Sequence, residues 1–114
     1  MEHSILFDAA QTAGRQAGAN KVPRAMVVRD GAYVYEPILD GVCGFAWVVV
    51  KPGNSAFAKW LVKSGHASKH YAGGVCVWIR DYNQSMEKKE AHAHAMAKVF
   101  SDAGIKAYSY SRMD

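Results

Sequence analysis

The spacing of apolar and polar residues along the chain predicts alternating helices and strands. Residues 24–35 predict a β-hairpin, because Asp30-Gly31 separates two strand-like runs. The pattern then predicts a strand at residues 43–50, a helix at 56–64, a strand at 75–80, a helix at 85–103 and a strand at 106–112. With an N-terminal helix, the predicted order is α-β-β-β-α-β-α-β.

The N-terminal helix is predicted over residues 4–19, where small apolar side chains recur at helical spacing. Ser4 is placed to cap this helix. Its apolar stripe consists largely of alanine and glycine, including Gly14 and Gly18. Such small residues allow the helix to approach a sheet or another subunit closely.

The alternation of strands and helices after the hairpin predicts how the sheet is built. From Cys43 onward the pattern is βαβαβ, which favours parallel strands joined by right-handed crossovers. We therefore predict an α/β fold with a mixed sheet, and a ferredoxin-like α+β arrangement is the alternative. The strand at 43–50 is apolar on both faces, so we expect it to be central and covered on both sides. The length of 114 residues suits a single domain, residues 1–114.

Composition and charge narrow the classes of protein. Half of the residues are hydrophobic, as in globular domains, and the formal net charge of +4 suits a partner that carries phosphates. Cys43 and Cys76 lie in apolar strand runs and are expected to be ordinary buried residues rather than a disulfide framework. No apolar run reaches the roughly 20 residues of a membrane span, and no signal-peptide pattern is present. We predict a cytoplasmic protein without a membrane partner.

A first polar turn, KPGNS, follows one predicted strand and precedes a helix. Ligands of α/β proteins bind at such turns, and helix N-termini favour anions. Lys51, Gly53, Asn54 and Ser55 are therefore candidates to contact a phosphate. The turn lacks the spacing of a Walker motif, and the alternative is a plain turn with a helix cap.

A second polar turn follows the next long strand. Asp81, Tyr82, Asn83 and Gln84 all carry groups that donate or accept hydrogen bonds. These side chains are candidates to read the base or ribose of a nucleotide. The alternative is capping chemistry together with solvated polar residues.

The last strand has an unusual alternation. Period two places four of its residues on one face: Lys106, Tyr108, Tyr110 and Arg112. Trp78 and Arg80 share a face of the preceding long strand. If the two faces coincide, aromatic rings flanked by arginines suit base stacking and phosphate contact. The alternative is a half-buried face covered by the N-terminal helix or by a dimer partner.

The histidines form no recognisable catalytic or metal-binding pattern. His92 and His94 are two residues apart on a predicted helix and cannot hold one ion together, while His66 and His70 lack Cys or Asp at ligand spacing. Nucleophile-elbow, paired-carboxylate and Cys-His signatures do not occur. We expect no catalytic residue, metal or other cofactor, and binding is favoured over catalysis.

The segment from Asp40 onward contains GVCGFAWVVVKPGNSAFAKWL, QSMEKKEAHAHAMA and SRMD, and it resembles a family of small uncharacterised bacteriophage-encoded proteins. The resemblance covers about two thirds of the chain and transfers no functional residues. It implies a place in the host cytoplasm. By analogy with other small phage proteins, it also implies interference with host defence, for example sequestration of a nucleotide signal.

These patterns predict a non-enzymatic and oligomeric protein that holds a phosphate-bearing ligand, with a nucleotide favoured. Tyr108 or Tyr110 would stack on the base, and Arg112 would read base or ribose with the second turn. The first alternative is a nucleic-acid-binding module that uses the aromatic and basic sheet face. The second is a protein-interaction or inhibitor protein without a small ligand, which would use the N-terminal helix or an exposed sheet face.

Overall fold

The structure, a computed structural model, describes residues 2–22, 29–30, 33–34, 43–70, 72–82 and 85–113. Its elements are α1 (His3–Asn20), β1 (Arg29–Asp30), β2 (Tyr33–Val34), β3 (Gly44–Lys51), α2 (Ala56–Lys63), β4 (Ser68–Lys69), β5 (Val75–Trp78), α3 (Met86–Asp102) and β6 (Lys106–Met113). This order matches the prediction with one addition. The added strand, β4, has two residues, which is too short for periodicity to reveal.

Four strands form one antiparallel sheet in the order β4-β5-β3-β6. The predicted parallel pairing is wrong, because β3 pairs antiparallel with both β5 and β6. Helix α2 leads into β4, which runs parallel to β3 but lies beyond β5, and the β4–β5 hairpin then reverses the chain. The segment from β3 to β6 is thus the β-α-β-β-α-β ferredoxin-like arrangement, and the fold is mixed α+β.

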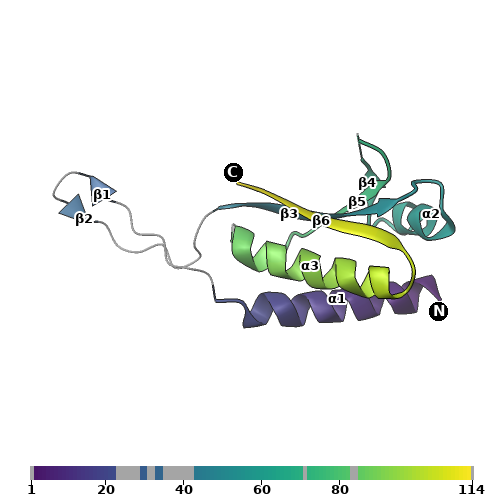
Figure 1. The fold of residues 1–114 in the computed structure, drawn as a ribbon, viewed down its shortest axis with the longest axis horizontal. Coiled ribbons are helices and arrows are strands. Elements are labelled where there is room, and N and C mark those ends of the chain that lie inside the picture. Colours follow the sequence, from purple (N-terminus) through teal and green to yellow (C-terminus); the bar gives the residue numbers. More distant parts are fainter. Residues whose placement is uncertain are drawn as a thin grey trace.

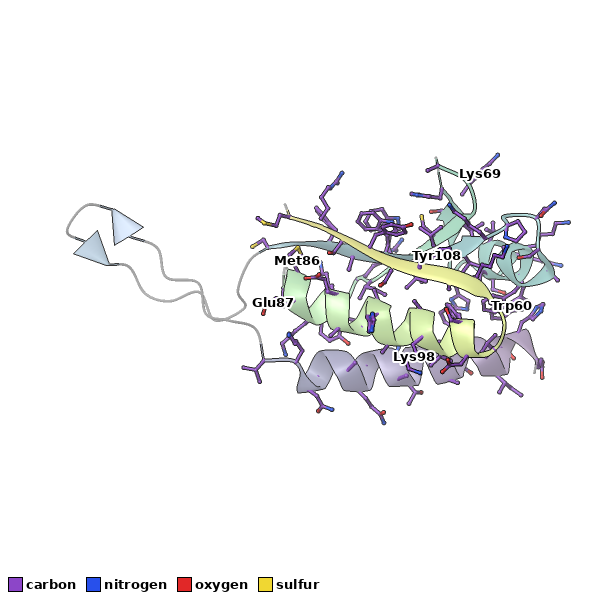
Figure 2. The ribbon with its side chains drawn as sticks, in the orientation of Figure 1. Trp60, Lys69, Met86, Glu87, Lys98 and Tyr108 are labelled. Atoms are coloured by element: carbon purple, nitrogen blue, oxygen red, sulfur yellow. The ribbon has the colours of Figure 1, made fainter. Side chains whose placement is uncertain are left out.

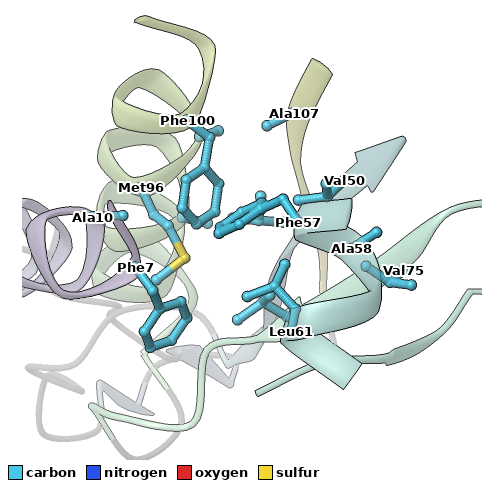
Figure 3. Close-up of a cluster of buried hydrophobic side chains, with 14 of the residues drawn as sticks. Phe7, Ala10, Val50, Phe57, Ala58, Leu61, Val75, Met96, Phe100 and Ala107 are labelled. Carbon is cyan, nitrogen blue, oxygen red and sulfur yellow. The ribbon is translucent and has the colours of Figure 1, made fainter. Parts of the chain in front are cut away.

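The helices cover one face of the sheet, and the hydrophobic core lies between them (Figure 1). On that face Val48 pairs with Val77, and Val50 pairs with both Val75 and Ala107. Figure 3 shows how aromatic and aliphatic side chains of α2 and α3 pack over Val50, Val75 and Ala107; the labelled ones from the two helices are Phe57, Ala58, Leu61, Met96 and Phe100. Strand β3 is central, as predicted, but the helices cover only one of its faces because they lie on the same side of the sheet.

Helix α1 packs mainly against α3 and forms a third layer (Figure 1). Two glycines permit this contact. A Cβ atom at Gly14 would lie 2.4 Å from Cδ2 of His92, and one at Gly18 would lie 2.3 Å from the hydroxyl of Tyr82. The stripe does approach its neighbours closely, but the expected partner, a sheet or another subunit, is wrong, because α3 and the second turn lie against it. The predicted cap at Ser4 is wrong, because Glu2 occupies the N-cap position.

Two smaller predictions have different outcomes. Strands β1 and β2 pair antiparallel, as the predicted hairpin requires, while residues 24–28, 31–32 and 35 of that hairpin lie outside the described residues. Cys76 is buried as expected, but Cys43 is exposed. It precedes β3 and forms only an isolated bridge with Ser85, so the sheet does not enclose it. Within the described part of the chain, no helix combines the length and the apolar character that crossing a membrane requires.

Candidate nucleic-acid interface

The face of the sheet turned away from the helices is formed by alternate residues of the strands. Directly paired residues of antiparallel strands point to the same side, so Trp47 shares this face with its partners Trp78 and Tyr110. We call the set that this register defines the open face. Its members are Phe45, Trp47, Val49, Lys51, Ser68, Cys76, Trp78, Lys106, Tyr108, Tyr110 and Arg112. Figure 2 shows side chains rising from the sheet on the side away from the helices.

Aromatic rings form a row across the open face. The ring centroid of Trp47 lies 4.8 Å from that of Trp78 and 6.1 Å from that of Tyr110, and the planes of the Trp47 and Tyr110 rings are inclined by only 23°. Phe45 meets Trp78 edge to face at 6.3 Å. Trp78, Tyr108 and Tyr110 remain 38%, 47% and 46% exposed. Trp78 and Tyr110 both contact Trp47, and with Tyr108 they offer exposed ring surface on which further flat groups can stack.

Positive charge flanks the aromatic row at both ends. The Arg112 guanidinium lies 5.7 Å from the Phe45 ring centroid at one end, and the Lys89 ammonium reaches within 5.5 Å of the same centroid. At the other end, Lys51 is paired directly with Lys106 across β3 and β6. Like charges at directly opposed positions destabilise a strand pair. No residue of β3, β4, β5 or β6 is acidic, so nothing within these strands balances the cations.

The buried charge of Lys89 strengthens this end of the face. Its side chain is 5% exposed and donates one hydrogen bond to the carbonyl oxygen of Gly44 at 3.3 Å. Within the described residues its ammonium forms no ion pair with a carboxylate. Ser85 caps the N-terminus of α3 one turn before Lys89, and the N-terminus of a helix is itself positive. An anion near Phe45 would therefore lie in a favourable field.

The two predicted turns lie at opposite ends of the sheet. The first turn follows Lys51 at the end of β3, whereas the second follows β5, which runs the other way past the Trp47–Trp78 pair. The group of Lys51, Gly53, Asn54 and Ser55 therefore does not meet the group of Asp81 and Tyr82. Asn83 and Gln84 lie outside the described residues. Antiparallel pairing thus separates what a parallel sheet would have brought together.

Ser55 and Tyr82 have structural contacts of their own. The Ser55 hydroxyl accepts a hydrogen bond from the backbone N–H of Ala58 at 3.2 Å, as the cap of α2. Tyr82 has a positive φ of 71°, which is uncommon for a residue other than glycine. Its hydroxyl lies 2.8 Å from Nδ1 of His92.

His92, which the sequence patterns raised only as a possible metal ligand, is a buried polar residue. It is 1% exposed, and its Nε2 lies 2.7 Å from Oε1 of Gln11 on α1. Burial lowers the pKa of His92, and this effect is larger than the opposing influence of Asp81. A neutral ring that donates from Nε2 to the Gln11 carbonyl oxygen accepts at Nδ1 from the Tyr82 hydroxyl. The sequence did contain a signal for this burial, because His92 lies at helical spacing from Ala93 and Met96, which are buried on α3. Among the described residues, no three His, Cys, Asp or Glu side chains are grouped as a metal ion would require.

Of the predicted aromatic and basic positions, five lie together on the open face: Trp78, Lys106, Tyr108, Tyr110 and Arg112. The register confirms that the two predicted faces coincide. Phe45 and Trp47 were missed, because their strand was expected to be covered on both sides. Arg80 lies beyond the end of β5 and is exposed. No family model, curated protein or solved structure matches the chain, so the function is inferred from this geometry.

Proposed function

We propose that the protein binds single-stranded nucleic acid on the open face. The observation that carries this proposal is a row of half-exposed aromatic rings on a sheet face that has cations at both ends and no acidic residue in its strands. Stacking of a base on an aromatic side chain contributes about 1–3 kcal/mol and is available to every base. The cations supply the sequence-independent attraction to phosphates.

Unpaired bases suit this face better than a duplex. Rings that lie on a sheet reach the flat faces of bases only where those bases are unstacked and splayed out. Four-stranded sheets that recognise RNA in this way stack two or three bases on their aromatic side chains. Trp78, Tyr108 and Tyr110 provide exposed ring surface of that extent.

The charge of the open face argues against a second copy of the chain as its occupant. A twofold interface places the same patch on both subunits. The cations Lys51, Lys106 and Arg112 of one copy would then face a patch whose strands contain no carboxylate. A polyanion satisfies these charges without that penalty.

Replacement of exposed rings tests the proposal. Tyr108→Ser and Tyr110→Ser should each weaken binding of a single-stranded homopolymer about tenfold, because each removes a stacking contact worth about 1–3 kcal/mol. Quenching of the Trp47 and Trp78 fluorescence by the oligonucleotide provides the measurement. Ile5→Ser is the matched control, since Ile5 is 54% exposed on α1 and does not belong to the open face. Wild-type affinity in both tyrosine variants would contradict the proposal.

A further inference from the structure

A cavity of about 600 Å³ lies beside the first turn, between α2 and the β4–β5 hairpin. We call it the turn cavity. Gly53 and Asn54 line it from the turn, Lys59 and Lys63 from α2, and Lys69 from β4. Lys69 pairs with Val75, whose side chain belongs to the covered side of the sheet. The turn cavity is therefore distinct from the open face, and Figure 2 shows Lys69 at the end of the sheet where α2 lies.

Three lysines give the turn cavity a strong positive charge. Lys59 and Lys63 are one helical turn apart and project from the same side of α2, opposite Lys69 of the hairpin. All three side chains are exposed, and none of them forms an ion pair within the described residues. No residue that lines the cavity is acidic. A concave site lined by one sign of charge attracts and concentrates the opposite ion.

The remaining lining suits an organic group attached to the anion. Val62 is 44% exposed and provides apolar wall between the lysines. The side chain of Asn54 has no hydrogen-bond partner among the described residues, so its amide is available to a ligand. Close packing shapes the floor, since a Cβ atom at Gly53 would lie 3.3 Å from the Cα atom of Gly74. The volume falls within the range of about 300–1,000 Å³ typical of small-molecule sites and exceeds what a bare ion fills.

We infer that the turn cavity binds the phosphate groups of a phosphate-bearing organic molecule, with the phosphates at Lys59, Lys63 and Lys69 and the organic part against Val62. Several ammonium groups around one cavity match an anion with more than one charge, and phosphate is the group that lysine binds as a point charge. The same chemistry is offered by a free nucleotide and by the phosphorylated 5′ end of a nucleic acid. The inference does not depend on binding at the open face.

The double variant Lys59→Gln/Lys63→Gln tests the charge of the cavity. Both positions are exposed, and glutamine has nearly the helix propensity of lysine, so α2 is preserved. Calorimetry with inorganic pyrophosphate should show binding to the wild-type chain and at least tenfold weaker binding to the double variant. Lys69→Gln should weaken binding in the same direction from the opposite wall. Lys98→Gln, an exposed lysine of α3, is the control and should leave the affinity unchanged.

Two further probes identify the source of the phosphate. Lysine-dependent binding of ATP, with equal affinity for oligonucleotides that carry a 5′-phosphate or a 5′-hydroxyl, supports a free phosphate ligand. Tighter binding of the 5′-phosphorylated oligonucleotide, lost in the double variant, supports a nucleic-acid end. The inference is overturned if pyrophosphate, ATP and the 5′-phosphate all fail to bind, or if the cavity variants match Lys98→Gln. If the wild-type chain bound pyrophosphate but no oligonucleotide, only the open-face proposal would be contradicted, since pyrophosphate reports on the cavity separately.

Discussion

His92 shows how a polar residue is accommodated in the core of this protein. Both of its ring nitrogens have partners, Tyr82 at Nδ1 and Gln11 at Nε2. These partners come from the second turn and from α1, so one imidazole connects three segments of the chain. A buried polar group that lost either partner would leave an unsatisfied donor or acceptor. The triad therefore fixes the position of α1 on α3.

The burial of His92 predicts a pH dependence of stability. Burial lowers its pKa below the ordinary value of 6.5, so the folded state resists protonation more than the unfolded chain does. Stability from this residue is fully present above pH 6.5 and is lost as the pH falls below that value toward the folded-state pKa. Urea unfolding across this range should show a steeper loss of free energy in the wild-type chain than in His92→Asn. Equal slopes in the two proteins would contradict this account.

The glycines of α1 predict the effect of one added methyl group. Gly14→Ala would place a Cβ atom 2.4 Å from Cδ2 of His92, so the helices must separate or the imidazole must move. Overpacking of this kind costs about 1–3 kcal/mol, which outweighs the helix propensity of about 1 kcal/mol that alanine gains over glycine. Denaturant unfolding should therefore show a less stable variant. The control is Thr12→Ala, at an exposed position of the same helix; a Gly14→Ala protein at least as stable as that control would contradict this packing.

Residue-level contacts of this kind were only partly predictable. The small stripe of α1 correctly indicated close approach, but its partner depends on the tertiary fold, since Gln11 and His92 are 81 residues apart. Tyr82 looked like a ligand-binding side chain because its neighbours are polar. The structure uses its hydroxyl in a contact with His92, which no local pattern reveals.

The capping of α2 gives a prediction at the level of the element. The Ser55 hydroxyl accepts the N–H of Ala58, so Ser55→Ala should lower the free energy of unfolding by about 1 kcal/mol. Ser55→Asp should retain most of the stability, because aspartate is also a strong N-cap. Thermal or denaturant unfolding of the two variants measures the difference. An unchanged free energy of unfolding in Ser55→Ala would show that the cap contributes little.

Element order was predictable because periodicity is a local property of the sequence. The helices and the long strands each contain enough residues to display it, and their observed bounds differ from the predicted ones by at most two residues. Strand direction was not predictable in the same way. Two residues of β4 reverse the chain before β5, and this changes the whole sheet from parallel to antiparallel.

At the scale of the whole molecule, the described residues form a sheet with one face covered by helices and one face open. Alternation within β6 predicted the side shared by Tyr108, Tyr110 and Arg112, and the register with β3 adds Trp47 and Phe45 to it. A strand that is apolar on both faces usually has cover on both. Here the second face of β3 and its neighbouring strands carries large aromatic rings that remain accessible. The proposed function explains why this face departs from the usual rule.

The measurement that tests the central claim most directly is the affinity of the wild-type chain for a single-stranded homopolymer as a function of salt. Contacts to phosphate from Lys51, Lys106 and Arg112 predict that log K falls with log salt with a slope of about −2, from roughly −0.7 per phosphate neutralised on a single strand. Binding with that slope, and weaker binding of the matching duplex, is the expected result. Failure to bind, or an affinity that does not change between low and moderate salt, would contradict the assignment of the open face to nucleic acid.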